Sequence, residues 1–324
     1  MNHLIKKVFK KNEMVSALLA LLLFAVLAVS SPYFFTTLNI NSLQTSIAPY
    51  AIMAVGMMAL LISGVFDMSV GSVMCLGGLV SAMCLGAGCN VLVAVAAGLA
   101  AGALVGFING FLVEVAGVNA LITTIGMMYI VRGICEVTLV GQSLSGFSNF
   151  PNSFLLLGRG KFLGIYMMFW AMLIIMAAFQ FYLRRRPGGR RLYYIGGNPS
   201  AARLMGIKSA KIRILTFMLS GTLSALAGIL VTARSGTANR YTGQDAQMDI
   251  IIACIIGGGS LAGGQGSVVG AFFGMAFMVL MSNAFNLYEV APQWQSICVG
   301  FILLVVIAVD GYVSLRKARR LGKI

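Results

Sequence analysis

Ten long apolar runs, separated by short polar connections, constrain this chain more than any other feature of its sequence. A helix needs roughly 20 mostly apolar residues to cross the hydrocarbon core of a bilayer. Runs of about that length occupy residues 14–31, 46–64, 68–85, 90–113, 120–140, 165–183, 214–232, 249–261, 267–285 and 294–310. The eighth run is short and rich in glycine, so we expect it either to be broken or to merge with the ninth. The sequence therefore predicts an all-α, polytopic membrane protein with about ten transmembrane helices in one domain, 1–324.

The charge content excludes a water-soluble protein. Only 10% of the 324 residues are charged and 59% are hydrophobic, whereas soluble domains carry about 25% charge. Too little polar surface remains to cover a soluble globule, which excludes a cytosolic enzyme. The net charge of +15 would suggest nucleic acid in a soluble protein. Here the basic residues lie in clusters between apolar runs, which indicates membrane orientation and no nucleic-acid partner.

Three basic segments set the expected orientation. The tail 1–13, the segment 184–213 and the tail 312–324 hold four, nine and five of the 23 Lys and Arg residues. Cytoplasmic connections carry such an excess, so ten spans with both termini in the cytoplasm fit the pattern. Arg132 then lies within a helix, and the basic residues on the opposite side are Arg159, Lys161, Arg234 and Arg240. Residues 6–30 also resemble a cleavable signal peptide, and charge counting does not decide whether the first helix is removed.

Glycines recur every four residues in two runs, at Gly98, Gly102, Gly106 and Gly110 and at Gly266, Gly270 and Gly274. This spacing keeps them on one helix face, where another backbone can approach closely. We expect a packing role for both sets and no chemistry.

The segment 184–213 contains a short predicted helix. Asn198 is a good N-cap, Pro199 suits the first helical position, and Gly206 can adopt the left-handed conformation beyond the last turn. A helix of six or seven residues is unstable alone in water. Leu204, Met205 and Ile207 give it an apolar patch. Two interpretations stay open, a docking element for a cytoplasmic partner or a helix that lies on its own bundle or on anionic lipid.

The same segment resembles the coupling-helix loop of permease subunits in monosaccharide ABC importers of the ribose, arabinose and xylose types. The matching residues are Gly196-Gly197-Asn198, Ala201-Ala202-Arg203-Leu204 and Gly206-Ile207. Further motifs keep the order of that family at 66–71, 119–124, 132–133, 219–221, 227–229 and 257–266, so the resemblance covers about 45–312. One departure is Ser200, where many ABC importers have Glu, so an acidic contact to the ATPase is not carried over.

The resemblance implies a multi-pass protein of the bacterial inner membrane that conducts a monosaccharide and performs no covalent chemistry. It also implies three protein partners: a second permease copy, a separate ABC ATPase and a periplasmic sugar-binding protein. The ATPase would contact the loop through Asn198, Pro199, Ser200, Ala201, Ala202, Arg203, Leu204, Met205 and Gly206. The sequence has no G-x-x-x-x-G-K-[ST] motif, so the chain has no P-loop with which to hydrolyse ATP. We expect no cofactor and no metal. The identity of the sugar, and whether the two permeases are identical, cannot be read from the residues.

Polar residues within or beside the apolar runs are candidates for the translocation pathway: Asp67, Asn119, Thr123, Thr124, Arg132 and Glu136. Each also has a structural interpretation. Asp67 can cap the helix that follows it, and Arg132 and Glu136 stand four apart and can form an ion pair. Glu114 is expected at a cytoplasmic helix end, reaching water. The alternative function is an ion-gradient-coupled secondary transporter, which needs intramembrane acidic residues.

Overall fold

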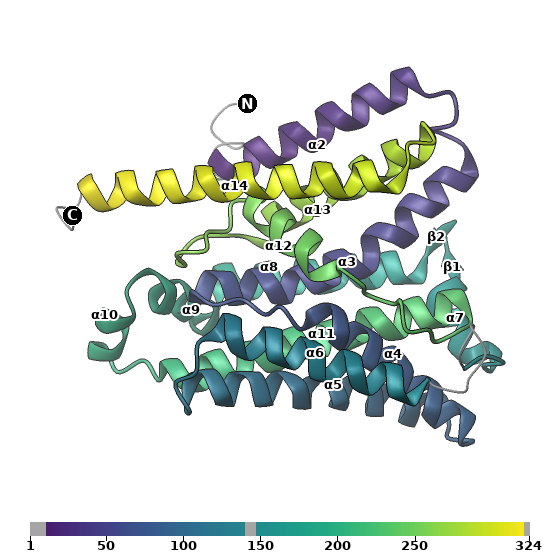
Figure 1. Cartoon of the computed structure of the whole chain (residues 1–324), viewed down its shortest axis with the longest axis horizontal. Coiled ribbons are helices and arrows are strands. Elements are labelled where there is room, and N and C mark those ends of the chain that lie inside the picture. The colour runs from purple at the N-terminus through teal and green to yellow at the C-terminus, as the bar shows by residue number, and fades with distance from the viewer. Residues whose placement is uncertain (1–10, 140–146, 321–324) are drawn as a thin grey trace.

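The computed structural model describes residues 11–139 and 147–320, and it is almost entirely helical (Figure 1). Each of the ten apolar runs falls on a helix of the described chain. These helices are α2 (Lys11–Ser30), α3 (Thr37–Ser63), α4 (Val70–Gly86), α5 (Val91–Glu114), α6 (Ala120–Thr138), α8 (Met167–Arg185), α11 (Ser209–Ser235), α12 (Ala246–Ile256), α13 (Val268–Leu287) and α14 (Pro292–Arg320). Seven are long and apolar enough to cross a membrane, whereas α4, α12 and the apolar part of α14 are shorter. The polytopic helical class is confirmed, and the number ten stays a prediction.

Five smaller elements lie between the long helices. They are α7 (Asn152–Arg159), β1 (Lys161–Phe162), β2 (Ile165–Tyr166), α9 (Pro187–Gly197) and α10 (Pro199–Leu204). The antiparallel hairpin of β1 and β2 is a departure from the all-α expectation. Its two-residue loop places Leu163 and Gly164 at φ values of 53° and 79°, as a type I′ turn requires.

Helix α3 forms the centre of the molecule. It packs against α8, α11, α12 and α13, and its residues from Ile47 to Ser63 are buried almost without interruption. A helix that is apolar on every side must be covered on every side, which explains this position. In Figure 1, α2, α13 and α14 lie above α3, and α4, α5, α6 and α11 lie below it.

Glycines of α5 face α11 at close range. A Cβ atom on Gly102 or Gly106 would collide with the carbonyl oxygen of Gly221 or Phe217, and one on Gly110 would lie 2.8 Å from the Ile214 Cα. The first glycine of the set, Gly98, faces Gly77 and Ser81 of α4 instead. The backbones of α5, α4 and α11 therefore approach one another where no side chain intervenes.

The second glycine set is split between a helix and a connection. Gly270 and Gly274 face the backbone of Gly257 and Ala253, so they bring α13 against α12. Gly266 lies outside the helix, at a φ of 141°, and faces α3. The helix starts later than expected because Ser267 caps it, accepting a hydrogen bond from the Gly270 N–H at 3.0 Å.

Helix α12 does not merge with α13. It has 11 residues, or about 16 Å at 1.5 Å per residue, which is roughly half the hydrocarbon core of a bilayer. Residues 257–267 connect it to α13, and the Gly264 N–H donates to the Ile62 carbonyl at 2.9 Å, which ties the connection to the end of α3. The short eighth run thus forms a half-length helix between two non-helical segments.

Candidate coupling loop and polar cavities

The segment between α8 and α11 contains two helices where the sequence predicted one. Helix α9 has Pro187 at its first position and buries Leu192 and Ile195. Gly196, near its end, lies so close to the Ile62 carbonyl and the Gly264 N–H that a side chain there would collide with both. Close packing of α9 on the end of α3 therefore fixes the position at which α10 begins.

The caps of α10 are those that the sequence predicts. The Asn198 side chain accepts a hydrogen bond from the Ala201 N–H at 3.0 Å, and Pro199 occupies the first helical position. Gly206 has a φ of 73°. The Gly206 and Ile207 N–H groups donate back to the Arg203 and Ala202 carbonyls at 2.9 and 3.0 Å. This is a Schellman ending, so both ends of a six-residue helix are hydrogen-bonded.

The surface of α10 divides into an anchored side and an exposed tip. The Ala202 side chain is buried, whereas Leu204 is 90% exposed and Met205 is 61% exposed. Two large apolar side chains therefore project from the end of the molecule beside the exposed Arg203. Such exposure on a helix with both ends capped is typical of a surface that another protein covers.

Arg213 ties this end of the molecule together. Its Nε and Nη2 atoms donate to the Ser63 carbonyl at 3.1 and 2.8 Å, and its Nη1 atom contacts the Glu114 carboxylate at 3.0 Å. The expectation that Glu114 reaches water is wrong, because this ion pair covers it. The ends of α3 and α5 are thereby joined to the start of α11.

A second link runs from α9 to the connection between α12 and α13. The Tyr193 hydroxyl donates to the Gly266 carbonyl at 2.9 Å. Burial raises the pKa of Tyr193 to about 12, with a smaller contribution from the Glu13 carboxylate. The hydroxyl therefore remains a donor across the physiological pH range.

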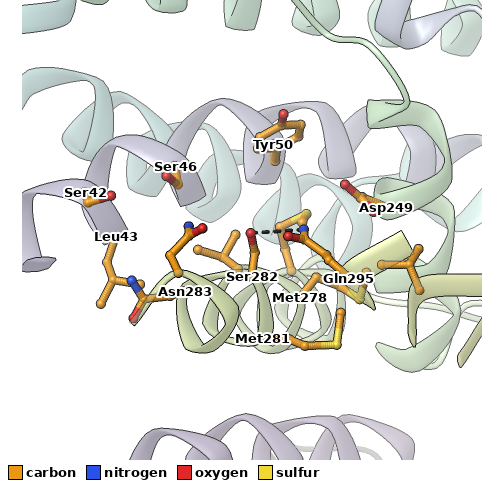
Figure 2. A pocket seen from close by; sticks show the side chains of 14 residues that line it. Ser42, Leu43, Ser46, Tyr50, Asp249, Met278, Met281, Ser282, Asn283 and Gln295 are labelled. Carbon is orange, nitrogen blue, oxygen red and sulfur yellow. Dashed lines mark hydrogen bonds between the residues drawn. The ribbon is translucent and has the colours of Figure 1, made fainter. Parts of the chain in front are cut away.

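A polar cavity of about 240 Å³ lies between α3, α12, α13 and α14, and we call it the Asp249 cavity (Figure 2). Its polar lining consists of Ser42, Ser46, Tyr50, Asp249, Ser282, Asn283, Asn286 and Gln295. The Gln295 amide donates to the Ser282 hydroxyl at 3.1 Å, and Asn283 exchanges hydrogen bonds with Asn39 of α3 at 2.6 and 3.3 Å. Hydroxyl, amide and carboxylate groups inside an apolar bundle offer donors and acceptors to a polar solute.

Asp249 was not among the site residues predicted from the sequence, where it only marks the start of the eighth run. In the structure it stands in the first turn of α12, and its side chain lines the cavity. The signal was an acidic residue next to an uninterrupted apolar run, which in a membrane is expensive unless it has a function.

Asp67 lies in a buried polar network on the connection between α3 and α4. Its Oδ1 atom accepts hydrogen bonds from the N–H and hydroxyl of Ser69 at 2.8 and 2.6 Å and from the Asn109 amide at 3.4 Å. Burial raises the pKa of Asp67, and these hydrogen bonds offset that effect only in part. The N-cap of α4 is Ser69, so Asp67 holds the turn that leads into the helix.

At the start of α6, Asn119 and Thr124 form hydrogen bonds with the backbone of their own helix, whereas the buried Thr123 hydroxyl has no hydrogen-bond partner within the described residues. The Asn119 side chain accepts from the Leu121 N–H at 2.9 Å as the N-cap, and the Thr124 hydroxyl donates to the Ala120 carbonyl at 2.9 Å. Thr123 is buried. None of these residues, nor Asp67, lines the Asp249 cavity or the cavity around Arg132.

Arg132 and Glu136 line one cavity of about 330 Å³ between α6 and the segment leading into α12. Arg132 is bound to the backbone, because its Nη1 atom donates to the Arg240 and Thr242 carbonyls at 2.8 and 3.1 Å. Within the described residues, no ion pair of 4.0 Å or less joins it to Glu136. Of the six predicted pathway residues, the structure therefore brings two into a shared cavity.

Known proteins similar to this chain over most of its length are transport permeases. A family model described as "Branched-chain amino acid transport system / permease component" matches residues 39–307. The ribose import permease protein RbsC of Escherichia coli strain K12 is 38% identical over 299 residues, which cover 92% of this chain and 93% of that protein. The L-arabinose ABC transporter permease protein AraH of Azospirillum brasilense is 34% identical, covering 94% of this chain and 88% of that protein.

A third relative is the autoinducer 2 import system permease protein LsrC of Photorhabdus laumondii, which is 31% identical over 94% of this chain and 91% of that protein. No solved structure matches this chain.

Proposed function

We propose that this chain, which belongs to the family of permease components of the branched-chain amino acid transport system type, transports a monosaccharide. It is the membrane-spanning permease subunit of an ATP-driven importer of the bacterial inner membrane. The observation that carries this proposal is the identity of 38% to a ribose import permease over nearly the full length of both chains. A second relative is named for L-arabinose, which is also a monosaccharide. The proposed class of solute, a monosaccharide, therefore rests on these two relatives.

The energy comes from a separate ABC ATPase that docks on α10. The chain has no P-loop of its own, and α10 presents Leu204 and Met205 to a partner. This end faces the cytoplasm, since it contains the basic segment 184–213 and lies at the same end as the end of α14 (Figure 1). A second permease copy, related by a two-fold axis, and a periplasmic sugar-binding protein complete the assembly.

Replacing Leu204 by Glu tests the docking surface. The side chain is 90% exposed, so its replacement leaves the permease folded but puts a charge into an apolar contact. We expect the L204E permease to lose at least tenfold in capture of the co-expressed ATPase and in ATP-dependent uptake. Leu163→Glu is the matched control, because Leu163 is 79% exposed on the hairpin at the opposite end. Equal ATPase capture by wild type and L204E would overturn the proposal.

The solute crosses through the Asp249 cavity. Four helices supply its polar groups, and one of them is the half-length α12, whose following connection is hydrogen-bonded to the end of α3 at Ile62. Polar groups inside a membrane bundle are costly and mark solute paths. Motion of α10 reaches this cavity through α9 and the connection 257–267, which contact each other at Gly196 and Gly264.

Asp249→Leu tests this path. We expect sugar uptake to fall by at least tenfold while the ATPase still co-purifies, with Asp249→Asn intermediate because the amide keeps hydrogen-bonding capacity. Met248→Leu, one residue earlier on α12, is the control. Wild-type uptake by D249L together with lost uptake by Glu136→Leu would move the path to the Arg132 cavity.

The energy source distinguishes the ABC importer from the alternative function, an ion-gradient-coupled secondary transporter. That alternative needs intramembrane acidic residues, and Asp249 joins Asp67 and Glu136 as a candidate. Uptake that survives an ionophore but stops on ATP depletion supports the ABC importer, and the reverse pattern supports ion coupling.

A further inference from the structure

A groove of about 980 Å³ lies between α8 and α11 and opens beside α10. We call it the α8–α11 groove. Its walls are apolar, with Ile175 and Phe179 on α8 and Leu215 and Leu219 on α11. None of these residues belongs to the Asp249 cavity, so this is a separate site.

Three cations stand at the mouth of the α8–α11 groove: Arg191 on α9, and Lys208 and Lys211 at the start of α11. All three side chains are exposed. Within the described residues, no hydrogen bond or ion pair joins them to another side chain, and no acidic residue lines the groove. The mouth therefore carries positive charge that the protein itself does not neutralise, which is the complement of an anionic group.

The depth of the groove matches one leaflet of a bilayer. Ile175 stands ten residues before the end of α8 at Arg185, and Leu219 stands ten residues after the start of α11 at Ser209. At 1.5 Å per residue both lie about 15 Å from the helix ends. This is half of the roughly 30 Å hydrocarbon core. A soluble partner docking from the cytoplasm would contact the mouth but not walls at this depth.

We propose that the α8–α11 groove binds an anionic phospholipid of the cytoplasmic leaflet. The phosphate lies against Arg191, Lys208 and Lys211, and an acyl chain lies between α8 and α11. Basic pockets between transmembrane helices on the cytoplasmic side are suited to such headgroups. Met205 and Ile207 also line the groove, so the bound lipid supports the end of α10 from below and makes coupling sensitive to lipid charge.

The test uses the assembled importer, reconstituted into phosphatidylcholine nanodiscs with or without phosphatidylglycerol. Native mass spectrometry counts retained phosphatidylglycerol, and sugar-stimulated ATP hydrolysis reports coupling. We expect wild type to retain the lipid and to hydrolyse ATP at least threefold faster with it. The double variant Lys208→Gln/Lys211→Gln should lose both effects. Leu215→Trp, which fills the apolar part without changing charge, should lose lipid retention as well.

Arg185→Gln/Arg186→Gln is the matched control, since it removes two exposed charges from the same end of the molecule but none from the groove. Equal lipid retention by wild type and K208Q/K211Q would overturn the proposal. So would loss of the ATPase or of the second permease copy from K208Q/K211Q in lipid-free detergent, because that result would make a protein the occupant of the groove.

Discussion

Arg213 shows how one side chain can hold three helix ends in register. Its guanidinium contacts a carbonyl at the end of α3 and a carboxylate at the end of α5, while its backbone belongs to the start of α11. Only 18% of the Arg213 side chain and 10% of the Glu114 side chain are exposed. Hydrogen bonds with charged partners are worth more in such a site than at the surface, because water competes less.

Replacing Arg213 by Gln should therefore lower the stability of the permease. The change leaves the largely buried Glu114 carboxylate without its cation, and we expect a loss of about 2 kcal/mol. Thermal unfolding of the purified protein in detergent measures this loss. Arg203→Gln on exposed α10 should leave the unfolding temperature unchanged. Arg213→Lys should be intermediate, because a compact ammonium keeps the charge but lacks the planar, spread donors with which the guanidinium reaches both acceptors. Equal unfolding temperatures for R213Q and R203Q would contradict the role of Arg213 in joining the three helix ends.

At the scale of the elements, glycine sets the distance between α5 and α11. A methyl group on Gly106 would collide with the backbone of Phe217 and Met218, and neither helix can yield without moving the other contacts along the face. Since lipid offers no hydrophobic drive between helices, close backbone approach supplies much of the association energy.

Gly106→Ala should destabilise the protein by about 1–3 kcal/mol through overpacking. Gly133→Ala on α6 provides the control, because a Cβ atom there has no described neighbour within 4 Å. Removing a flexible helical glycine there should be neutral or stabilise by up to about 1 kcal/mol. Scanning fluorimetry on both variants compares them directly, and a G106A protein as stable as G133A would show that the α5–α11 contact does not limit stability.

Local features of the elements were predictable, and long-range ones were not. The caps of α10 depend on Asn198 and Gly206, which act on backbone groups within a few residues of themselves. The partner of Arg132 is different, because it is a carbonyl of Arg240, 108 positions away in the sequence. Helix α9 was missed because its basic residues hide the spacing of Leu192 and Ile195. Asp249 was missed because only the fold brings it together with polar residues of α3, α13 and α14 around one cavity.

At the scale of the whole molecule, the ends of the bundle differ in charge and in structure. Helices α9 and α10 lie at one end together with the end of α14, and the β1–β2 hairpin with α7 lies at the other (Figure 1). At the hairpin end, Arg159 donates to the Arg234 and Ser235 carbonyls at 2.9 Å each. This cation therefore supplies hydrogen bonds to two backbone carbonyls at the end of α11. Lysines 6, 7, 10 and 323, which also entered the orientation argument, lie outside the described residues. The orientation of the termini therefore remains a prediction.

Cysteine labelling tests the orientation in cells. Cys89, between α4 and α5, is an exposed free thiol at the hairpin end, and Ser200 is exposed on α10. If the basic end faces the cytoplasm, a membrane-impermeant maleimide should label Cys89 in spheroplasts. In a Cys84→Ser/Cys89→Ser background, Ser200→Cys should be labelled only after permeabilisation. Expression without the ATPase keeps position 200 uncovered, and Cys84→Ser/Cys89→Ser alone measures the background from the remaining thiols. Labelling at position 200 but not at Cys89 in sealed spheroplasts would invert the topology and remove α10 from the reach of any cytoplasmic ATPase.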